Sequence, residues 1–399
     1  MKSVPVKKKK QLIAQNEATL LQLVRSYQGI SRIELAALMG VAPSTIGIFV
    51  SRLLKEGFLI EEETVKLERG RPRTVLRLNP EGGCLLGVDF EANRIRAICL
   101  NFNEEIEQTI SVKVNPAHGV QEVLDKISEA VRSVMPKKPK RILGLGVAVP
   151  GPVDQEKGTS VYYKHIKGWE NVPLTAYLKA QFKVPVYLEN NIRAMASAEL
   201  WFGQGRTLQQ YVCIGVRSGI GAGIVANNQI YTGAHHSAGE IGSWRCPAFV
   251  VNNGSVQTDS PYIELEEAAS VRAVLENLRT AVKNGKSSSL PKSGLTVNHI
   301  IQAYQGGDPL TVAHLNKAAD ALGWLAGQIA VLLDPEKIIF SGAFMLLGKP
   351  FLDRIREAIS EHVHLRHVKC PELAASELGE FNGALGAAAQ IVHHWTPER

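Results

Sequence analysis

Five consecutive residues near the amino-terminal end, Arg69-Gly70-Arg71-Pro72-Arg73, combine three guanidinium groups with a glycine and a proline that keep the backbone narrow and extended. Arginine side chains on such a segment can enter the slim minor groove of A·T-rich DNA, where the negative potential is strongest. A basic hairpin that only contacts solvent has the same composition, so the pentapeptide alone does not decide between the two interpretations.

The sequence before this pentapeptide has the pattern of a helix-turn-helix. Apolar residues at helical spacing predict a first helix over residues 17–27, with one apolar face. Ser31 and Glu34 fit a capping box at the start of a second helix, because each side chain can satisfy a free backbone N–H group of the other residue. We expect Leu35 and Leu38 to form the core face of this second helix.

A third helix is expected to begin at Pro43, since proline suits the first helical position. The outward side chains of this helix that we expect to contact DNA are Ser44, Thr45, Ile48 and Arg52. Gly47 and Ile48 stand where long hydrogen-bonding side chains would normally contact base edges. We therefore expect few direct hydrogen bonds between this helix and the bases.

Two short strands, over residues 58–60 and 75–78, are predicted on either side of the pentapeptide. The pentapeptide then lies in the wing of a winged helix-turn-helix domain spanning residues 1–80. In that context Arg69, Gly70, Arg71 and Arg73 are candidate DNA-contacting residues, and the partner is double-stranded DNA.

The charge distribution supports the same interpretation. The first 80 residues hold 14 Lys and Arg against 7 Glu, whereas the remaining basic and acidic residues cancel, so the net charge of +7 belongs to one end of the chain. A basic excess beside a neutral body is typical of a phosphate-binding module joined to a sensing or catalytic domain. The run Lys7 to Lys10 is expected to add only salt-dependent, sequence-independent attraction.

Composition indicates an ordinary globular protein. With 399 residues, 45% hydrophobic and 21% charged, the chain is long enough for two or three domains. We expect no membrane segment, no signal-type apolar region and a cytoplasmic location. The five cysteines are scattered without paired spacing, which predicts reduced thiols rather than disulfides or a zinc motif.

The rest of the chain alternates β-rich and helical runs, which predicts an α/β fold. These runs cover residues 85–89, 95–100, 120–134, 142–149, 184–189 and 211–216. Glycine-rich joints follow several strands, at residues 149–154, 219–223 and 239–242. Any one of them could be only a tight turn, and their order along the chain is more informative.

That order resembles the ROK family, named for repressors, open reading frames and kinases. The motifs that carry the resemblance include Gly87-Val88-Asp89, Pro150-Gly151-Pro152-Val153-Asp154, Glu189-Asn190-Asn191, Gly239-Glu240-Ile241-Gly242 and Leu378-Gly379-Glu380. The resemblance covers nearly the whole chain and implies a two-lobed, actin-like sugar-kinase fold. The implied lobes are residues 81–194, with 375–399 packing back on them, and residues 195–374. Members with an amino-terminal winged helix, such as repressors of xylose and N-acetylglucosamine use, resemble this chain more than stand-alone kinases do.

Three changes from the family's kinases remove what phosphoryl transfer needs. Asn191 stands where those kinases have the Asp that accepts the hydroxyl proton, and an amide cannot act as that base. Glu91-Ala92-Asn93 replaces the Gly-Gly-Thr hairpin that approaches the nucleotide. Ser243 replaces the zinc-binding His, and Cys246 is alone where three cysteines bind zinc. We therefore expect no catalytic residue, metal or cofactor, although Arg217, in the second phosphate loop, could attract an anion.

The resemblance also implies sugar-contacting positions. They are Gly151, Asn190, Asn191, Glu240 and Glu266. Asparagine and carboxylate side chains suit a polyol, because they exchange several hydrogen bonds with hydroxyl groups. Glu240 and Glu266 could instead be structural or surface carboxylates, and the missing zinc-bound His leaves the identity of the sugar open.

The expected function is a DNA-binding repressor of carbohydrate-use genes, controlled by a sugar or sugar derivative in an inactive kinase cleft and acting as a homodimer or higher homo-oligomer. Two alternatives stay open. One is an active sugar kinase with a DNA-binding appendage, which a coupled ATP-turnover assay distinguishes. The other is a repressor controlled by a partner protein.

Overall fold

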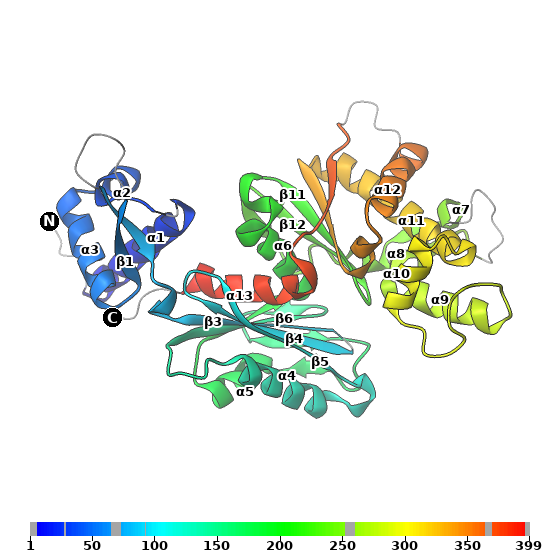
Figure 1. Ribbon diagram of the computed structural model, residues 1–399, viewed down its shortest axis with the longest axis horizontal. Coiled ribbons are helices and arrows are strands. Elements are labelled where there is room, and N and C mark those ends of the chain that lie inside the picture. Colours follow the sequence, from blue (N-terminus) through cyan, green and yellow to red (C-terminus); the bar gives the residue numbers. More distant parts are fainter. Residues whose placement is uncertain are drawn as a thin grey trace.

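The computed structural model describes residues 6–27, 29–64, 73–91, 93–251, 260–363 and 369–395. These residues form a small amino-terminal part and two larger α/β lobes, which lie on either side of helix α13 (Figure 1). The elements of the amino-terminal part are α1 (Val6–Tyr27), α2 (Arg32–Met39), α3 (Pro43–Lys55), β1 (Leu59–Thr64) and β2 (Arg73–Leu78).

The amino-terminal part has the geometry of a winged helix-turn-helix. The Ser31 hydroxyl accepts the backbone N–H of Glu34, and the Glu34 carboxylate accepts that of Ser31, which confirms the predicted capping box. Helices α2 and α3 are bent by 118° at their junction, as in helix-turn-helix motifs. Strands β1 and β2 pair antiparallel, and Ile30 adds a backbone bridge to Leu76.

Two expectations about this part were wrong. Leu38 was expected in the core, but its side chain is 49% exposed, because α2 contributes Leu35 and Ala36 to the core instead. Tyr27, at the end of the predicted apolar face of α1, is also exposed. Tyr27 is the last residue of α1, and Leu38 is the next-to-last residue of α2.

We call lobe 1 the sheet with strand order β10-β6-β3-β4-β5, together with its helices. Its elements are β3 (Cys84–Glu91), β4 (Arg94–Asn101), β5 (Ile106–Lys113), α4 (Val120–Val134), β6 (Ile142–Val149), α5 (Leu174–Phe182), β10 (Val186–Asn190) and α13 (Asn382–His394). A small three-stranded sheet accompanies them, made of β7 (Val153–Asp154), β8 (Thr159–Tyr162) and β9 (Glu170–Val172).

We call lobe 2 the sheet with strand order β13-β12-β11-β16-β17, together with its helices. Its elements are β11 (Tyr211–Val216), β12 (Ile220–Ala226), β13 (Gln229–Tyr231), β14 (Arg245–Pro247), α7 (Ala248–Val251), β15 (Tyr262–Glu264), α8 (Leu265–Ala269), α9 (Val271–Lys283), α10 (Val297–Gln305), α11 (Pro309–Leu333), β16 (Lys337–Ser341), α12 (Lys349–His362) and β17 (Glu372–Ala375).

The two sheets have the same topology. In each, a three-stranded antiparallel meander is followed by two strands that run parallel to its first strand. This repetition is the two-lobed α/β fold that the sequence predicts.

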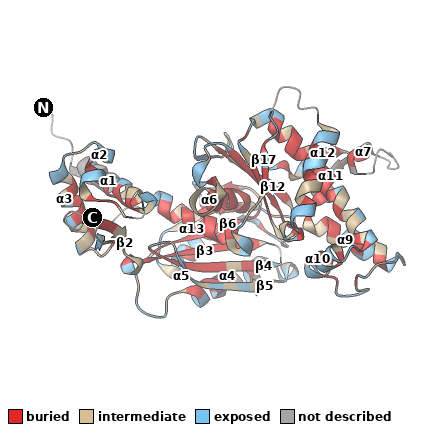
Figure 2. Cartoon of the chain, turned by 45° about the horizontal axis from the view of Figure 1, so that its top comes forward, coloured by how far each residue is buried: buried red, intermediate tan, exposed pale blue. Residues whose placement is uncertain are grey.

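Helices α6 (Asn191–Phe202) and α13 cross between the lobes at very short range. Helix α13 lies on β3 and β6, where Gly87 and Gly146 let its backbone approach the sheet. At Gly386 of α13, a Cβ atom would overlap the carbonyl oxygen of Ala194 in α6. The opposite side of α6 packs on β11 and β12 of lobe 2. Most of α13 is buried by these contacts (Figure 2).

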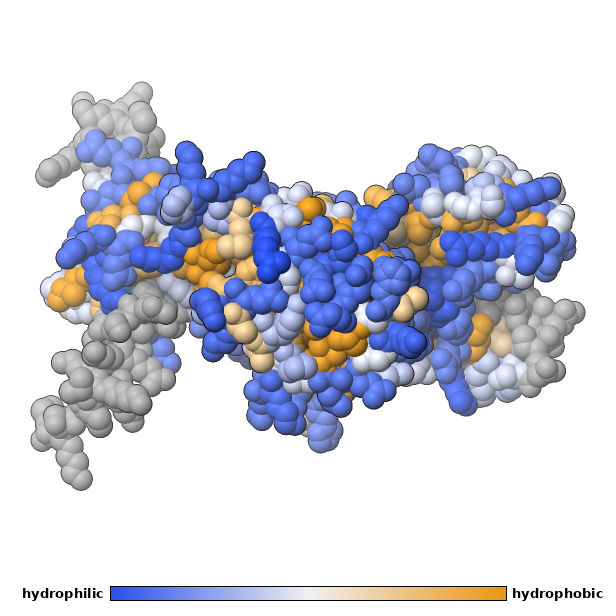
Figure 3. All heavy atoms as spheres, turned by 90° about the horizontal axis from the view of Figure 1, so that it is seen from below, coloured by the Kyte–Doolittle hydropathy of each residue, from blue (hydrophilic) through white to orange (hydrophobic). Residues whose placement is uncertain are grey.

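The molecular surface carries no continuous apolar band on the face seen in Figure 3, where hydrophobic patches are separated by hydrophilic side chains. Within the described residues, no single helix is long and apolar enough to cross a membrane; only the bent pair α2–α3 meets that criterion, by length and composition.

Replacing Gly386 by Ala tests the α6–α13 crossing. Helix propensity alone would make the substitution stabilising, but the overlap with Ala194 should instead lower the free energy of unfolding by ~1–3 kcal/mol. Gly47, whose added Cβ would meet no atom within 4 Å, is the matched control, and Gly47→Ala should raise stability by about 0.5–1 kcal/mol. Urea unfolding measures both; equal gains for the two variants would contradict the close crossing.

Candidate functional site

A cleft between the lobes encloses a cavity of about 210 Å³. It is bounded by the β6–β7 joint and the start of α6 on one side, and by the β11–β12 turn and α8 on the other. The structure brings together all five predicted sugar-contacting residues in its lining: Gly151, Asn190, Asn191, Glu240 and Glu266.

Asn190 is used mainly to build the cleft. Its side-chain oxygen accepts the backbone N–H groups of Ile192 at 2.9 Å and Arg193 at 3.2 Å, so it is the N-cap of α6. Its side-chain nitrogen donates to the Gly151 carbonyl at 3.0 Å. Asn190 therefore holds the start of α6 against the β6–β7 joint.

Gly151 has φ +77°, in the left-handed region that favours glycine. A Cβ atom there would overlap the backbone carbonyl of Tyr162. The glycine is therefore needed for the path of the chain beside the cavity, whether or not a ligand approaches it.

Asn191 is the first residue of α6, and its side chain is only 6% exposed. Among the described residues, none forms a hydrogen bond with its side-chain amide, although the residue lines the cavity. A nearly buried amide with free donor and acceptor capacity is suited to a ligand that offers both kinds of group.

Glu266 links the two lobes at the mouth of the cleft. Its carboxylate lies 3.0 Å from Nζ of Lys164 and 3.9 Å from Nε2 of His165, both on the loop between β8 and β9. The neighbouring His165 and Lys164, opposed by burial, lower the pKa of Glu266 to about 2. Glu266 is therefore an ionised acceptor facing the cavity.

Glu240 lies at the rim, where its side chain reaches solvent. Its Oε1 is 3.4 Å from the side-chain nitrogen of Asn190. Partial desolvation by the cleft walls raises the pKa of the Glu240 carboxyl, and the charge of Arg193 opposes that shift.

At the inner end of the cleft, Arg217 joins the lobes through a buried ion-pair cluster, which we call the arginine clasp. Its guanidinium donates to both carboxylate oxygens of Asp89, at 3.0 and 2.6 Å, and to Glu91 at 2.5 Å. Arg96 makes a further ion pair with Glu91 at 2.8 Å. Asp89 is fully buried, and the side chains of Arg217 and Glu91 are 8% and 13% exposed.

Burial and opposite charges act against each other in the clasp. Burial raises the pKa of the Asp89 carboxyl, and the charge of Arg217 opposes this shift. Burial alone would raise the pKa of Glu91, but the charges of Arg217 and Arg96 lower it to about 2. Burial acts against the charge of Arg217 as well, but Asp89 and Glu91 raise the pKa of its guanidinium. The sequence suggested that Arg217 could attract an anion; in the structure the protein's own carboxylates take that place.

No three His, Cys, Asp or Glu side chains form a metal-binding group within the described parts of the chain. Cys246 is buried, and its Sγ lies 3.7 Å from the carbonyl oxygen of Pro247. Ser243 belongs to a short 3₁₀ turn, and His235 is exposed.

On α3, the predicted DNA-contacting residues divide into two groups. Ser44 and Ile48 face outward, with Ile48 70% exposed, and Thr45 is partly exposed. Arg52 turns back instead and forms ion pairs with Glu17 at 2.8 Å and Glu56 at 2.7 Å. Glu17 is buried, and the sequence pattern gave no indication that it would form an ion pair with Arg52.

The predicted wing residues Arg69, Gly70 and Arg71 lie outside the described residues. Arg73 begins β2, and its backbone pairs with Thr64.

The acid dependence of stability tests the clasp. Because the pKa of Glu91 is lowered from 4.5 to about 2 in the folded protein, its ionised form stabilises the native state above pH 4.5 and loses this effect as the pH falls toward 2. The difference in unfolding free energy between wild type and Glu91→Gln should therefore be largest at neutral pH and shrink below pH 4.5. Chemical denaturation across this range measures it, and a constant difference would exclude the clasp.

Comparison with known proteins identifies the family of this chain. The ROK family model matches residues 85–394. A xylose repressor from Caldicellulosiruptor bescii is 28% identical over 94% of this chain and 95% of its own length. A glucokinase from Thermotoga maritima is 27% identical, but covers 77% of this chain and 96% of its own length. The crystal structure of a ROK family transcriptional regulator, a homologue of the Escherichia coli MLC protein, superposes with a TM-score of 0.77 at 22% identity, covering 96% of this chain and 97% of that one. The chain belongs to the ROK family.

Proposed function

We propose that this protein is a DNA-binding transcriptional repressor whose operator affinity falls when a sugar binds between its two lobes. The main support is the combination of two features: a winged helix-turn-helix, and a cleft in which the arginine clasp occupies the position expected for nucleotide phosphates. The full-length similarity to a xylose repressor supports the same proposal, because that relative matches 94% of the chain whereas the glucokinase relative matches 77%.

The cleft favours binding over phosphoryl transfer. A kinase needs a carboxylate that accepts the proton of the attacking hydroxyl, and the corresponding position here is the amide of Asn191. It also needs room and positive potential for the phosphates. Here the guanidinium of Arg217 already binds Asp89 and Glu91, so its charge is balanced before any nucleotide arrives.

The sugar-facing side of the cleft keeps suitable groups. The unpaired amide of Asn191 can donate and accept, and the carboxylates of Glu240 and Glu266 can accept, which is the set of contacts that adjacent hydroxyl groups require. Lys164 and His165 approach Glu266 from lobe 1, so a sugar bound beside them would contact both lobes. We propose that such binding fixes the angle between the lobes.

The DNA-binding surface combines α3 with the wing. We propose that Ser44, Thr45 and Ile48 enter the major groove and that Arg69, Gly70, Arg71 and Arg73 contact the minor groove. Arg52 is better explained as a residue that fixes α3 on α1, through Glu17, than as a base contact. A homodimer would present two such helices to two half-sites of an operator.

Operator titration with and without sugar tests the proposed function. We expect sequences enriched by the protein from a random duplex library to lose affinity by about 5- to 150-fold when D-xylose, D-glucose or N-acetyl-D-glucosamine is present at saturation. Asn191→Ala should remove most of this response, whereas Asn298→Ala, on the exposed surface of α10, should leave it intact. Enriched sequences whose affinity ignores a broad sugar panel would reject sugar control.

Contact between Ile48 and a thymine is a second testable consequence. Ile48 is the exposed apolar side chain on the outward face of α3, and the C5-methyl of thymine is the apolar group in the major groove. Replacing the contacted dT by dU removes that methyl and should weaken wild-type binding by about 0.8 kcal/mol, roughly fourfold. In Ile48→Ala the same DNA change should have almost no effect. An equal dU penalty in both proteins would show that Ile48 does not make the contact.

A further inference from the structure

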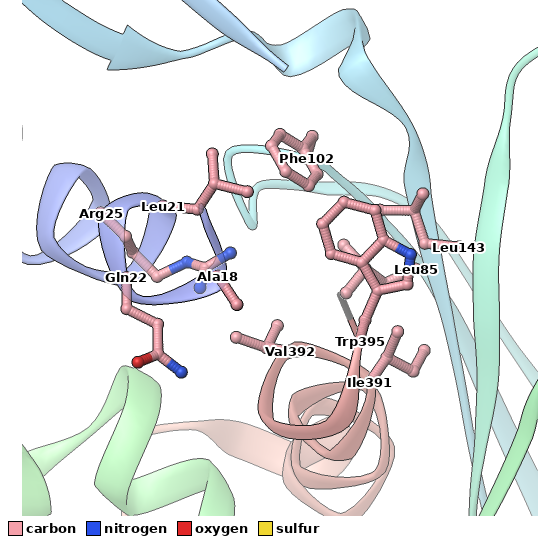
Figure 4. Close-up of a pocket in the computed structure, with 10 residues that line it drawn as sticks. All are labelled: Ala18, Leu21, Gln22, Arg25, Leu85, Phe102, Leu143, Ile391, Val392 and Trp395. Carbon is pink, nitrogen blue, oxygen red and sulfur yellow. The ribbon is translucent and has the colours of Figure 1, made fainter. Parts of the chain in front are cut away.

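The winged helix is attached to lobe 1 by a continuous hydrophobic core rather than by a free linker. Phe58 of the amino-terminal part lies 5.2 Å from Phe102 of lobe 1 and 5.0 Å from Trp395, measured between ring centroids. Leu20 and Leu21 of α1 belong to the same core cluster as Ile391 and Val392 of α13. Figure 4 shows α1 and α13 meeting there around a cavity of only about 20 Å³. The winged helix therefore moves with lobe 1.

One side chain at this joint contacts both lobe 1 and α6. Arg25, near the end of α1, forms an ion pair at 2.5 Å with Glu104, on the turn between β4 and β5 of lobe 1. Each of the two side chains is only 13% exposed. The guanidinium of Arg25 also lies 6.0 Å from the ring centroid of Trp201, in the last turn of α6. We call these three residues the Arg25 junction.

The junction and the cleft lie at opposite ends of the same helix. Helix α6 begins with Asn191 in the cleft and ends one residue beyond Trp201, and along its length it packs on α13 of lobe 1 and on the strands of lobe 2. A rotation of lobe 2 that carries α6 must therefore displace Trp201 relative to Arg25. The charge of Arg206, which follows α6, also acts on Glu104.

The electrostatics make the junction sensitive to such a displacement. Burial raises the pKa of Glu104, and the charges of Arg25 and Arg206 oppose this shift. Burial likewise lowers the pKa of Arg25, which Glu104 opposes. Because a buried ion pair is favourable only with good geometry, a small shift of α6 changes the energy of the joint sharply, whereas an exposed pair would absorb it.

We propose that the Arg25 junction transmits lobe rotation from the sugar cleft to the winged helix, by coupling the displacement of Trp201 to the Arg25–Glu104 ion pair. This inference rests on the proposed sugar-controlled repressor function and names the residues that would connect its two sites. Removing the junction should abolish the effect of sugar binding on operator affinity while leaving sugar affinity unchanged.

The experiment compares wild type with Arg25→Gln and Trp201→Leu, which alter the junction from its two sides. Operator affinity is measured with and without saturating D-xylose, D-glucose and N-acetyl-D-glucosamine, and sugar affinity is measured by calorimetry. In both variants we expect unchanged sugar affinity and a sugar effect on operator binding reduced to less than about twofold, from about 5- to 150-fold in wild type. Thermal unfolding verifies that each variant is folded.

Arg132→Gln is the matched control, because Arg132 also lies over an aromatic ring, 5.6 Å from the centroid of Phe182, but between α4 and α5. It should keep the full wild-type response. Folded variants that keep the wild-type response would overturn the inference, and so would variants that lose sugar affinity, since the junction would then belong to the cleft itself. A wild-type protein that binds an operator but ignores every sugar would instead refute the proposed sugar control on which the inference rests.

Discussion

The close crossing of α6 and α13 is the constraint on which the other features of this protein depend. The missing side chain of Gly386 allows the two backbones to touch at Ala194, so α6 is held between the lobes with no room for intervening side chains. The start of α6 is then fixed in the cleft by the Asn190 cap, and its end is fixed beside the winged helix at Trp201. A single helix of 12 residues thus extends from the cleft to the winged helix.

The arginine clasp places a buried cluster of ion pairs in the cleft. A buried cluster of this kind has a large desolvation cost, which is offset here because Arg217 donates to both oxygens of Asp89 and also to Glu91, while Arg96 balances the second carboxylate. The same contacts occupy the guanidinium of Arg217, which would otherwise be free to attract an anion. The cleft also holds an amide and two carboxylates, which suit the hydroxyl groups of the proposed sugar ligand.

Local sequence signals predicted the elements well, because capping and periodicity act over a few residues. The capping box at Ser31, the strand Ile142–Val149 and the helix Val120–Val134 all occur as the sequence indicates. The family motifs likewise placed Asn191 and Glu266 in one cleft. The roles of Arg52, Arg217 and Arg25 were beyond such reasoning. Their partners Glu17, Asp89 and Glu104 lie 35, 128 and 79 positions away, and only the packed fold brings each pair together. For Arg217 the sequence indicated only that it could attract an anion, and the packed fold shows that its partners are Asp89 and Glu91.

The central claim is that one conformational equilibrium serves two ligands, so each must weaken the other by the same factor. The most direct test is calorimetric titration of sugar into the free protein and into the protein saturated with operator DNA. The account predicts that operator lowers sugar affinity by the same factor by which sugar lowers operator affinity. Equal sugar affinity for free and operator-bound protein would contradict it.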